Sequence, residues 1–110
     1  MSDEKSALIR ALNDSLRTTF LGGRVVMTSG VQMLPEDQLT KLLTAVRAFK
    51  DFDEENDPHE EHDFGSILQD GVKFFWKIDY FDRQLVYGSE DPSQPEITTR
   101  VLTLMLAEEY

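Results

Sequence analysis

The sequence predicts an α+β fold, in which a small, mainly antiparallel sheet carries helices packed on one face, in the order α-β-α-β-β-β-α. Two patterns indicate it most strongly: apolar residues recur at helical spacing from Leu39 to Phe49, and an Asp70-Gly71 pair joins two strand-like runs. The length agrees, because 110 residues suffice for one domain with its own core. We therefore expect a single α+β domain over residues 1–110, with an acidic connecting segment at 51–63.

The N-terminal residues predict a helix that runs to about Thr19. Ser2 supplies a capping hydroxyl, and Asp3 and Glu4 place acids where the helix dipole favours them. The apolar side chains at helical spacing are Leu8, Ile9, Leu12, Leu16 and Phe20. We expect the helix to end at residues 22–23, because both are glycines, which adopt the left-handed cap conformation at low cost.

A short strand and a second helix are expected next. Residues 24–31 are rich in β-branched side chains and include Gly30 near their end. Pro35 then lies in a first helical turn, where its missing N–H costs nothing. The apolar stripe that follows, at positions i, i+3, i+4, i+7 and i+10, consists of Leu39, Leu42, Leu43, Val46 and Phe49.

Two antiparallel strands are predicted at 63–68 and 72–81, joined by a tight turn at 69–71. An Asp-Gly pair between apolar runs is a strong hairpin signal because both residues tolerate positive φ. One alternating set in the second strand is expected to face the core: Val72, Phe74, Trp76, Ile78 and Tyr80. The opposite set mixes aromatic and charged residues, and its Phe75 and Phe81 are candidates for contact with a protein partner.

The C-terminal part is predicted to form a short third strand at 85–87 and then a final helix. Ser93 and Glu96 have the spacing of a capping box. The apolar residues that follow are Ile97, Val101, Leu102, Leu104, Met105 and Leu106. They would make a helix apolar around most of its girth, which predicts burial against the sheet or against a second subunit.

The acidic charge is concentrated in one segment. The chain has 21 acidic and 11 basic residues, a net charge of −10, and eight of the acids fall within residues 51–63, which hold no Lys or Arg. These eight are Asp51, Asp53, Glu54, Glu55, Asp57, Glu60, Glu61 and Asp63. Mutual repulsion favours an extended, solvated segment, whose ends Phe52 and Phe64 are expected to attach to the core.

Composition also excludes several classes of protein. The absence of Cys removes disulfide scaffolds, thiolate zinc sites and Cys nucleophiles. No apolar run approaches the roughly 18 residues of a membrane span, and residues 1–10 lack a signal-peptide hydrophobic stretch, so we expect a cytoplasmic protein without membrane contact. The net charge of −10 argues against direct binding of nucleic acid.

The cluster from His59 to Asp63 is the one part of the sequence that resembles a metal site. Two imidazoles three residues apart share a face of a helix, and neighbouring carboxylates could complete a shell for zinc or a similar ion. The order HEEH is not the HExxH motif, however, and Pro58 just before it does not favour a helix. We expect both histidines to be surface or capping residues, with no bound cofactor; a metal-binding protein or small metal-dependent enzyme is the alternative.

Other chemistry finds little support in the sequence. No Ser lies in a G-x-S-x-G turn, and residues 22–24 are too short for a phosphate loop. The aromatics between Phe74 and Phe81 resemble a base-stacking platform, yet such platforms sit in basic surroundings, so core packing is the better interpretation. Acid–base work by paired carboxylates stays open, because a sequence does not show which acids meet in a cleft. We do not expect an enzyme.

Several stretches, in order along residues 8–110, resemble a family of short acidic bacterial proteins catalogued as a domain of unknown function. The stretches are LGGRVV at 21–26, EHDFG at 61–65, FWKIDYFD at 75–82, SEDP at 89–92 and RVLTLMLAEEY at 100–110. One departure is His59, where the family usually has an aromatic residue. The resemblance transfers no catalytic residues. It implies a plasmid or mobile-element setting, in which small accessory proteins often counter host defence systems.

These observations predict a small acidic intracellular protein that binds the basic surface of another protein. The eight acids of residues 51–63 are the expected partner-binding residues, with Phe52 and Pro58 fixing their arrangement. The expected partner is a nucleic-acid-binding effector or nuclease, which a DNA-mimicking acidic surface would inhibit as an anti-restriction or anti-CRISPR protein. A homodimer is compatible with this prediction.

Overall fold

A computed structural model describes residues 3–110 of the chain. Four strands form a single sheet in the order β1-β4-β3-β2, in which β1 runs parallel to β4 and the other two pairs are antiparallel. The strands are β1 Arg24–Met27, β2 Phe64–Gln69, β3 Val72–Phe81 and β4 Thr99–Leu106. The predicted α+β class with a mainly antiparallel sheet is therefore confirmed.

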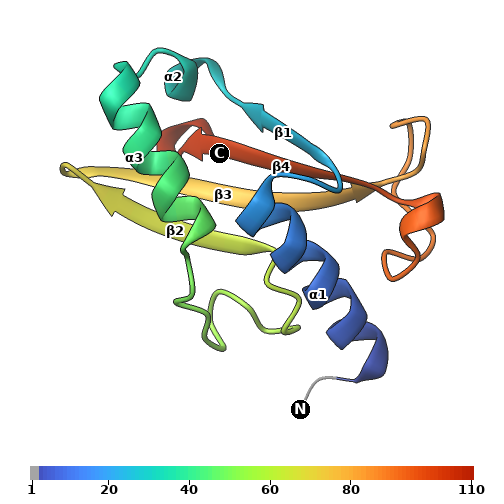
Figure 1. The fold of residues 1–110 in the computed structure, drawn as a ribbon. Helices are drawn as coiled ribbons and strands as arrows, with labels where there is room; N and C mark the ends of the chain where they lie inside the picture. Colours follow the sequence, from blue (N-terminus) through green and yellow to red (C-terminus); the bar gives the residue numbers. More distant parts are fainter. Residues whose placement is uncertain (1–2) are drawn as a thin grey trace.

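Helices cover one face of this sheet. The described helices are α1 Glu4–Thr19, α2 Ser29–Gln32, α3 Glu36–Arg47 and the single 3₁₀ turns η1 Pro95–Ile97 and η2 Ala107–Glu109. Figure 1 shows α1 and α3 side by side on the same face, while α2 lies at the end of β1. No helix within residues 3–110 is both long enough and apolar enough to cross a bilayer.

The two long helices form where the sequence predicts them. Asp3 caps α1 by accepting a hydrogen bond from the backbone N–H of Ser6 at 2.7 Å, whereas the predicted Ser2 cap lies outside the described residues. The helix ends at Thr19, as predicted, but the left-handed cap residue is Phe20, with a φ of 61°, and not one of the two glycines at 22–23. Pro35 is the N-cap of α3, one residue before the first turn in which it was predicted, and the buried stripe of α3 includes Leu42 and Val46.

The hairpin is also confirmed, and its turn has the predicted chemistry. Asp70 and Gly71 have φ values of 53° and 78°, the left-handed pair that a two-residue hairpin turn requires. Trp76 is fully buried at the centre of β3. Gly65 lies opposite it on β2, and a Cβ at that position would overlap the indole ring, so this strand pair needs a glycine there.

The predicted C-terminal helix is wrong, because these residues form the central strand β4. Its side chains alternate in burial, and Arg100, Leu102 and Leu104 point toward the helices. A strand with apolar residues on both faces has no polar stripe, so its apolar run cannot be told from a buried helix by periodicity. Ser93 does not cap a helix either: its N–H and Oγ–H both donate to Asp91.

Two further predictions are corrected. Residues 85–87 form no strand; the connection only bridges Phe81 to Gly88, and Leu85 has a left-handed φ of 61°. The strand predicted at 24–31 stops at Met27, and α2 follows it. The change of direction brings Gly30 against η2, where its N–H donates to the carboxylate of Glu109 at 3.0 Å.

The core lies between the helices and the sheet. Its buried apolar side chains are Leu16, Val31, Leu42, Val46, Phe74, Trp76, Ile78, Leu102 and Leu104. Burial of these side chains is the main contribution to stability, at about 1.5–3 kcal/mol for each large one. None of the described α-helices lies on the opposite face of the sheet, although Met105 on that face is only 3% exposed.

Candidate functional site

The acidic segment, residues 51–63, is a folded loop between α3 and β2 that lies beside α1 (Figure 1). Phe52 anchors its first part. The Phe52 ring is half-buried and stacks on His62, with centroids 3.7 Å apart and planes 3° from parallel. Its centroid lies 5.1 Å from that of Phe49 and 6.1 Å from that of Trp76, both in edge-to-face geometry, so the start of the segment is attached to the core.

The first turn of the segment is closed by its own side chains. One carboxylate oxygen of Asp53 accepts hydrogen bonds from the N–H groups of Glu55 at 2.9 Å and Asn56 at 3.0 Å. The Asn56 amide completes the turn: its oxygen accepts from the N–H of Asp53, and its nitrogen donates to the carbonyl of Asp51. These bonds fix the backbone at the most acidic point of the chain and leave the Glu54 and Glu55 side chains exposed.

Asp57 closes the second turn from inside. Its side chain is buried, with only 5% of the residue exposed, and one oxygen accepts from the N–H groups of Glu61 and His62, each at 3.0 Å. The bend needs left-handed backbone at Glu60 (φ 56°) and His62 (φ 55°), a conformation that is costly for residues with a side chain. The charge-assisted hydrogen bonds to Asp57 offset that cost.

His62 lies between two carboxylates from different parts of the chain. Its Nδ1 is 2.8 Å from an oxygen of Asp14 on α1, and its Nε2 is 3.6 Å from an oxygen of Asp57. The same Asp14 oxygen also accepts from the guanidinium of Arg17 at 3.1 Å. Arg17 is itself buried and donates to three carbonyls at the end of α3, so His62 is tied through α1 to α3.

Beneath the segment, a buried polar cluster connects α1 to β3 and β4. Asn13 donates to the Glu61 carbonyl at 2.9 Å and to the Tyr80 hydroxyl at 2.8 Å, and its oxygen accepts from Arg100 at 2.8 Å. The Tyr80 hydroxyl in turn donates to the Glu61 carboxylate at 2.8 Å. Glu61 is thus held by both its backbone and its side chain.

Burial changes the acid–base behaviour of this cluster. It raises the pKa of the Tyr80 hydroxyl well above its usual range, and the hydrogen bond to Glu61 raises it further, so Tyr80 stays a donor at neutral pH. Burial also lowers the pKa of Arg100 from its usual value. The pKa of Asp63 is raised, mainly by burial and then by the negative charge of Glu61.

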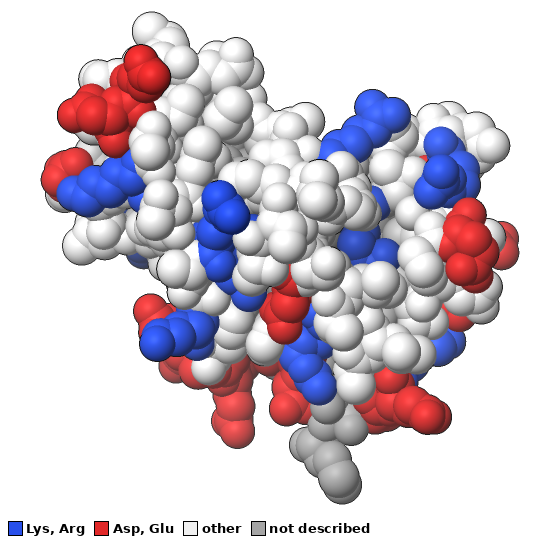
Figure 2. All heavy atoms as spheres, in the orientation of Figure 1, with Lys and Arg blue, Asp and Glu red and all other residues white. Residues whose placement is uncertain are grey.

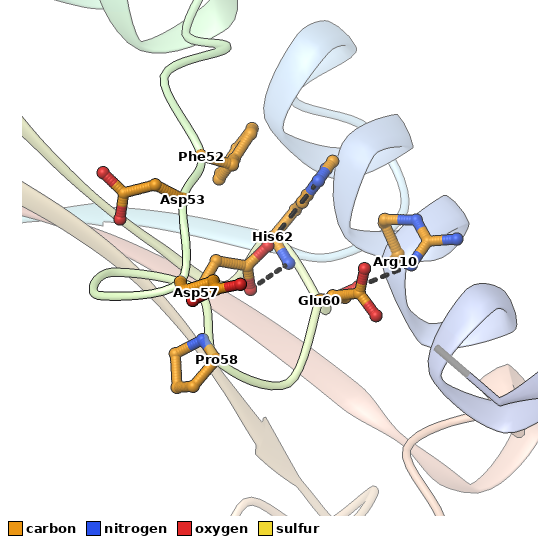
Figure 3. A pocket seen from close by; sticks show the side chains of 8 residues that line it. Arg10, Phe52, Asp53, Asp57, Pro58, Glu60 and His62 are labelled. Carbon is orange, nitrogen blue, oxygen red and sulfur yellow. Dashed lines mark hydrogen bonds and ion pairs between the residues drawn. The ribbon is translucent and has the colours of Figure 1, made fainter. Parts of the chain in front are cut away.

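The segment and α1 enclose a hollow of about 590 Å³, which we call the acidic hollow (Figure 3). Its lining residues are Arg10, Phe52, Asp53, Glu54, Asp57, Pro58, Glu60 and His62. Arg10 reaches it from α1 and donates to the Glu60 carbonyl at 2.8 Å. The lining holds four acidic residues against one cation, Arg10, so the hollow has an excess of negative charge that favours a cationic side chain or amine.

The structure divides the eight predicted partner-binding acids into two groups. Exposed side chains belong to Asp51, Asp53, Glu54, Glu55 and Glu60, whereas Asp57, Glu61 and Asp63 are buried or half-buried. Acidic side chains gather at the lower edge of the molecule in Figure 2, below the end of α3 and the start of β2. The expected extended, solvated course is wrong, because the hydrogen bonds to Asp53 and Asp57 fold the segment into turns that contact α1.

The alternative metal site gains no observation in its favour. His59 is exposed, and both ring nitrogens of His62 already face carboxylates. Within residues 3–110, no group of three or more His, Asp or Glu side chains is arranged to hold a metal ion.

Sequence reasoning missed the contribution of α1 to this site. Arg10, Asn13, Asp14 and Arg17 all reach toward the acidic segment or the polar cluster beneath it. Their spacing of three and four residues places them on one helix face, so the polar stripe was visible in the sequence. The stripe gave no sign, however, that its contact partner is the acidic segment, which lies about 48 residues later in the sequence.

Fold and site together define a small acidic α+β protein whose charged loop is fixed by a buried polar cluster. The family whose model matches this chain is described as "Protein of unknown function (DUF3768)", and the match covers residues 27–109. The chain belongs to that family, which confirms the resemblance seen in the sequence; the bacterial, mobile-element setting stays a prediction. Neither a comparison with curated proteins nor one with solved structures found a match.

Proposed function

We propose that this protein binds a basic surface of another protein through the acidic segment, and that the partner is a nucleic-acid-binding effector or nuclease of a restriction or CRISPR system, which it inhibits. The observation that supports the proposal is the fixed placement of the segment. The buried Asp57 and the half-buried Phe52 and Glu61 hold the backbone. Five acidic residues of the segment stay exposed, and three of them, Asp53, Glu54 and Glu60, line the acidic hollow.

A fixed arrangement matters because flexible charges bind with a larger entropic cost. Carboxylates held along one surface can take the places of DNA phosphates in a basic groove, and complementary charge speeds encounter and sets orientation. The acidic hollow adds a specific contact. Its acidic lining, which includes Asp53 and Glu54, is suited to one long Arg or Lys side chain of the partner.

The test compares two triple variants that remove the same charge. Asp51→Asn, Glu54→Gln and Glu55→Gln neutralise exposed side chains of the segment and spare Asp53, whose carboxylate closes a turn. The control is Glu90→Gln, Glu96→Gln and Glu108→Gln, which neutralises exposed acids elsewhere. Each immobilised protein is used to capture partners from a host lysate at low salt, and the captured protein is then titrated in purified form.

We expect the segment variant to bind the captured protein at least roughly tenfold more weakly than the wild type, with the control close to the wild type. Binding of the wild type should weaken steeply as salt rises, and duplex DNA should compete for the partner. Equal affinity of the two triple variants would show that the segment is not the binding surface. A partner that neither binds DNA nor loses activity in the complex would remove the inhibitor proposal.

A further inference from the structure

We propose that β2 is the contact between two copies of this chain, which pair through it as antiparallel strands about a two-fold axis. The inference starts from the sheet order, which leaves β1 and β2 as the two edges (Figure 1). Exposed edges pair with other chains unless charge, proline or shortness protects them. The edge strand β1 has four residues and begins with Arg24, whereas β2 has six residues and carries neither charge nor proline.

The hydrogen bonds of the hairpin show which backbone groups of β2 are free. Alternate residues of an antiparallel strand bond to the same neighbour, and the N–H of Ile78 bonds to the carbonyl of Asp63 at 2.8 Å. Residues 63, 65, 67 and 69 therefore bond to β3. The N–H and C=O groups of Phe64, Ser66 and Leu68 point away from the sheet, and none bonds to another part of residues 3–110.

This set of free groups fits a second copy of itself. With the two-fold axis at Ser66, the paired residues are Phe64 with Leu68 of the other copy, Ser66 with Ser66, and Leu68 with Phe64. All six outward groups of each strand then find partners. The side chains match as well, because each exposed Leu68, at 74%, is placed beside a Phe64 that already contacts Phe75.

The surface next to the strand is also compatible with its own copy. A groove of about 310 Å³ runs between β2 and the end of α3. The small side chains of Ala45 and Ala48 in its lining leave room for α3 of the second copy. The charged residues in the groove are Lys50 and Asp51, which form no ion pair within the described residues. One cation and one anion give the groove no net charge, so its own charges do not oppose pairing with a second copy.

The expected dimer is weak. A standard interface buries roughly 800 Å² on each partner, and a six-residue strand edge supplies less. Each chain also carries a net charge of −10, so long-range repulsion opposes pairing at low salt. We therefore expect association in about 0.3 M salt, as the protein concentration rises from roughly 5 µM to roughly 500 µM.

Sedimentation equilibrium with one matched pair of variants tests the contact. Leu68→Lys places a charge on the proposed interface, and Leu21→Lys makes the same change at an equally exposed site near the opposite edge, 72% against 74%. We expect the wild type and Leu21→Lys to approach twice the 12.6 kDa of one chain, and Leu68→Lys to stay at 12.6 kDa with an unchanged circular dichroism spectrum. A wild type that stays at 12.6 kDa throughout, or equal association of both variants, would overturn the proposal.

A cysteine probe tests the register, because the chain contains no Cys of its own. Ser66→Cys places two thiols across the axis with Cα atoms about 5.5 Å apart, within reach of a short bifunctional thiol reagent. The control is Ser15→Cys on the exposed face of α1. The pairing is supported if the reagent cross-links Ser66→Cys into a dimer and leaves Ser15→Cys monomeric. It is contradicted if both variants cross-link equally, or if Ser66→Cys forms a dimer in solution that the reagent does not cross-link. Neither variant changes a residue of the acidic segment, so the partner-binding proposal is tested separately.

Discussion

Two turns in different parts of the molecule share one backbone arrangement. In the acidic segment, Asp57 accepts from the N–H groups four and five residues later, those of Glu61 and His62. In the connection from β3 to β4, Asp82 accepts from the N–H groups at the same spacing, those of Val86 and Tyr87. In each turn the third residue after the aspartate is left-handed and donates its N–H to the aspartate carbonyl at 3.1 Å.

The surroundings of the two turns differ. Asp57 is 5% exposed, and the residues that it caps contact α1 and β3. The residues capped by Asp82 project into solvent, with Val86 64% and Tyr87 75% exposed. The charge-rich turn is therefore packed against α1 and β3 through its buried Asp57, whereas the turn at Asp82 leaves the apolar side chains of Val86 and Tyr87 in solvent, the reverse of what composition alone predicts.

The difference shows that an aspartate cap sets the local turn, and that long-range partners decide whether the turn is packed. The acidic segment has such partners on α1 in Arg10, Asn13 and Asp14. The turn at Asp82 has no hydrogen-bonded partner of this kind on α1 within the described residues. High charge density does not prevent a segment from folding when its backbone carbonyls and carboxylates find buried donors.

The largest expected effect is a loss of stability when the buried aspartate of the first turn is removed. The matched change at the exposed turn should have a much smaller effect. Asp57→Ala removes a buried acceptor of two N–H groups and should lower the free energy of unfolding by about 3 kcal/mol. Asp82→Ala deletes the same two local bonds where water can replace them, and should cost about 1 kcal/mol or less. Urea unfolding followed by Trp76 fluorescence measures both. Equal losses would contradict the distinction between the two turns.

The second comparison concerns the aromatic rings of the two loops. Phe52→Ala should lower the free energy of unfolding by about 2 kcal/mol, because the ring is half-buried against His62, Phe49 and Trp76. Tyr87→Ala removes a ring that is 75% exposed and should change it by no more than about 0.5 kcal/mol. Thermal unfolding at neutral pH resolves a difference of this size. A loss of stability for Tyr87→Ala that equals or exceeds the loss for Phe52→Ala would contradict this prediction.

The smallest effect is a pH dependence at the end of the acidic segment. The pKa of Asp63 is raised in the folded protein, so folding favours its protonated form. Its contribution to stability is complete below the usual pKa of 3.8 and is lost as the pH rises through the raised value. Asp63→Asn mimics the protonated form and should raise Tm by about 2 °C at pH 7, with no gain near pH 3.

A matched control separates this local effect from the general repulsion within the segment. Asp51→Asn removes one charge from the same segment at an exposed position. It should raise Tm at pH 7 by less than Asp63→Asn does. A gain for Asp63→Asn that persists at pH 3, or one that Asp51→Asn equals, would contradict the role of burial.

Local signals made part of the fold predictable. The turn at Asp70 and Gly71 and the stripe that includes Leu42 and Val46 depend on spacing within a few residues, and both form as expected. The strand β4 was mistaken for a helix because it carries apolar residues on both faces. That pattern follows from its central place between β1 and β3, which depends on pairings with distant residues.

The site shows the same limit. Its charge was predictable because eight acids lie close together in the sequence, and Phe52 was correctly expected to attach to the core. The inward positions of Asp57 and Glu61 were not, since they depend on donors from the segment's own turn and on Asn13 and Tyr80, distant in the sequence. A carboxylate that caps a buried turn and one that faces solvent look alike in a list of acids.

The most direct test of the central claim, that the acidic segment is fixed by buried anchors, is a residue-by-residue ¹⁵N relaxation measurement. Backbone order parameters of residues 52–62 should lie near those of the sheet, at about 0.85, and those of residues 83–87 should be lower. Order parameters below about 0.6 through residues 52–62 would mean that the carboxylates have no fixed arrangement, and would contradict the account.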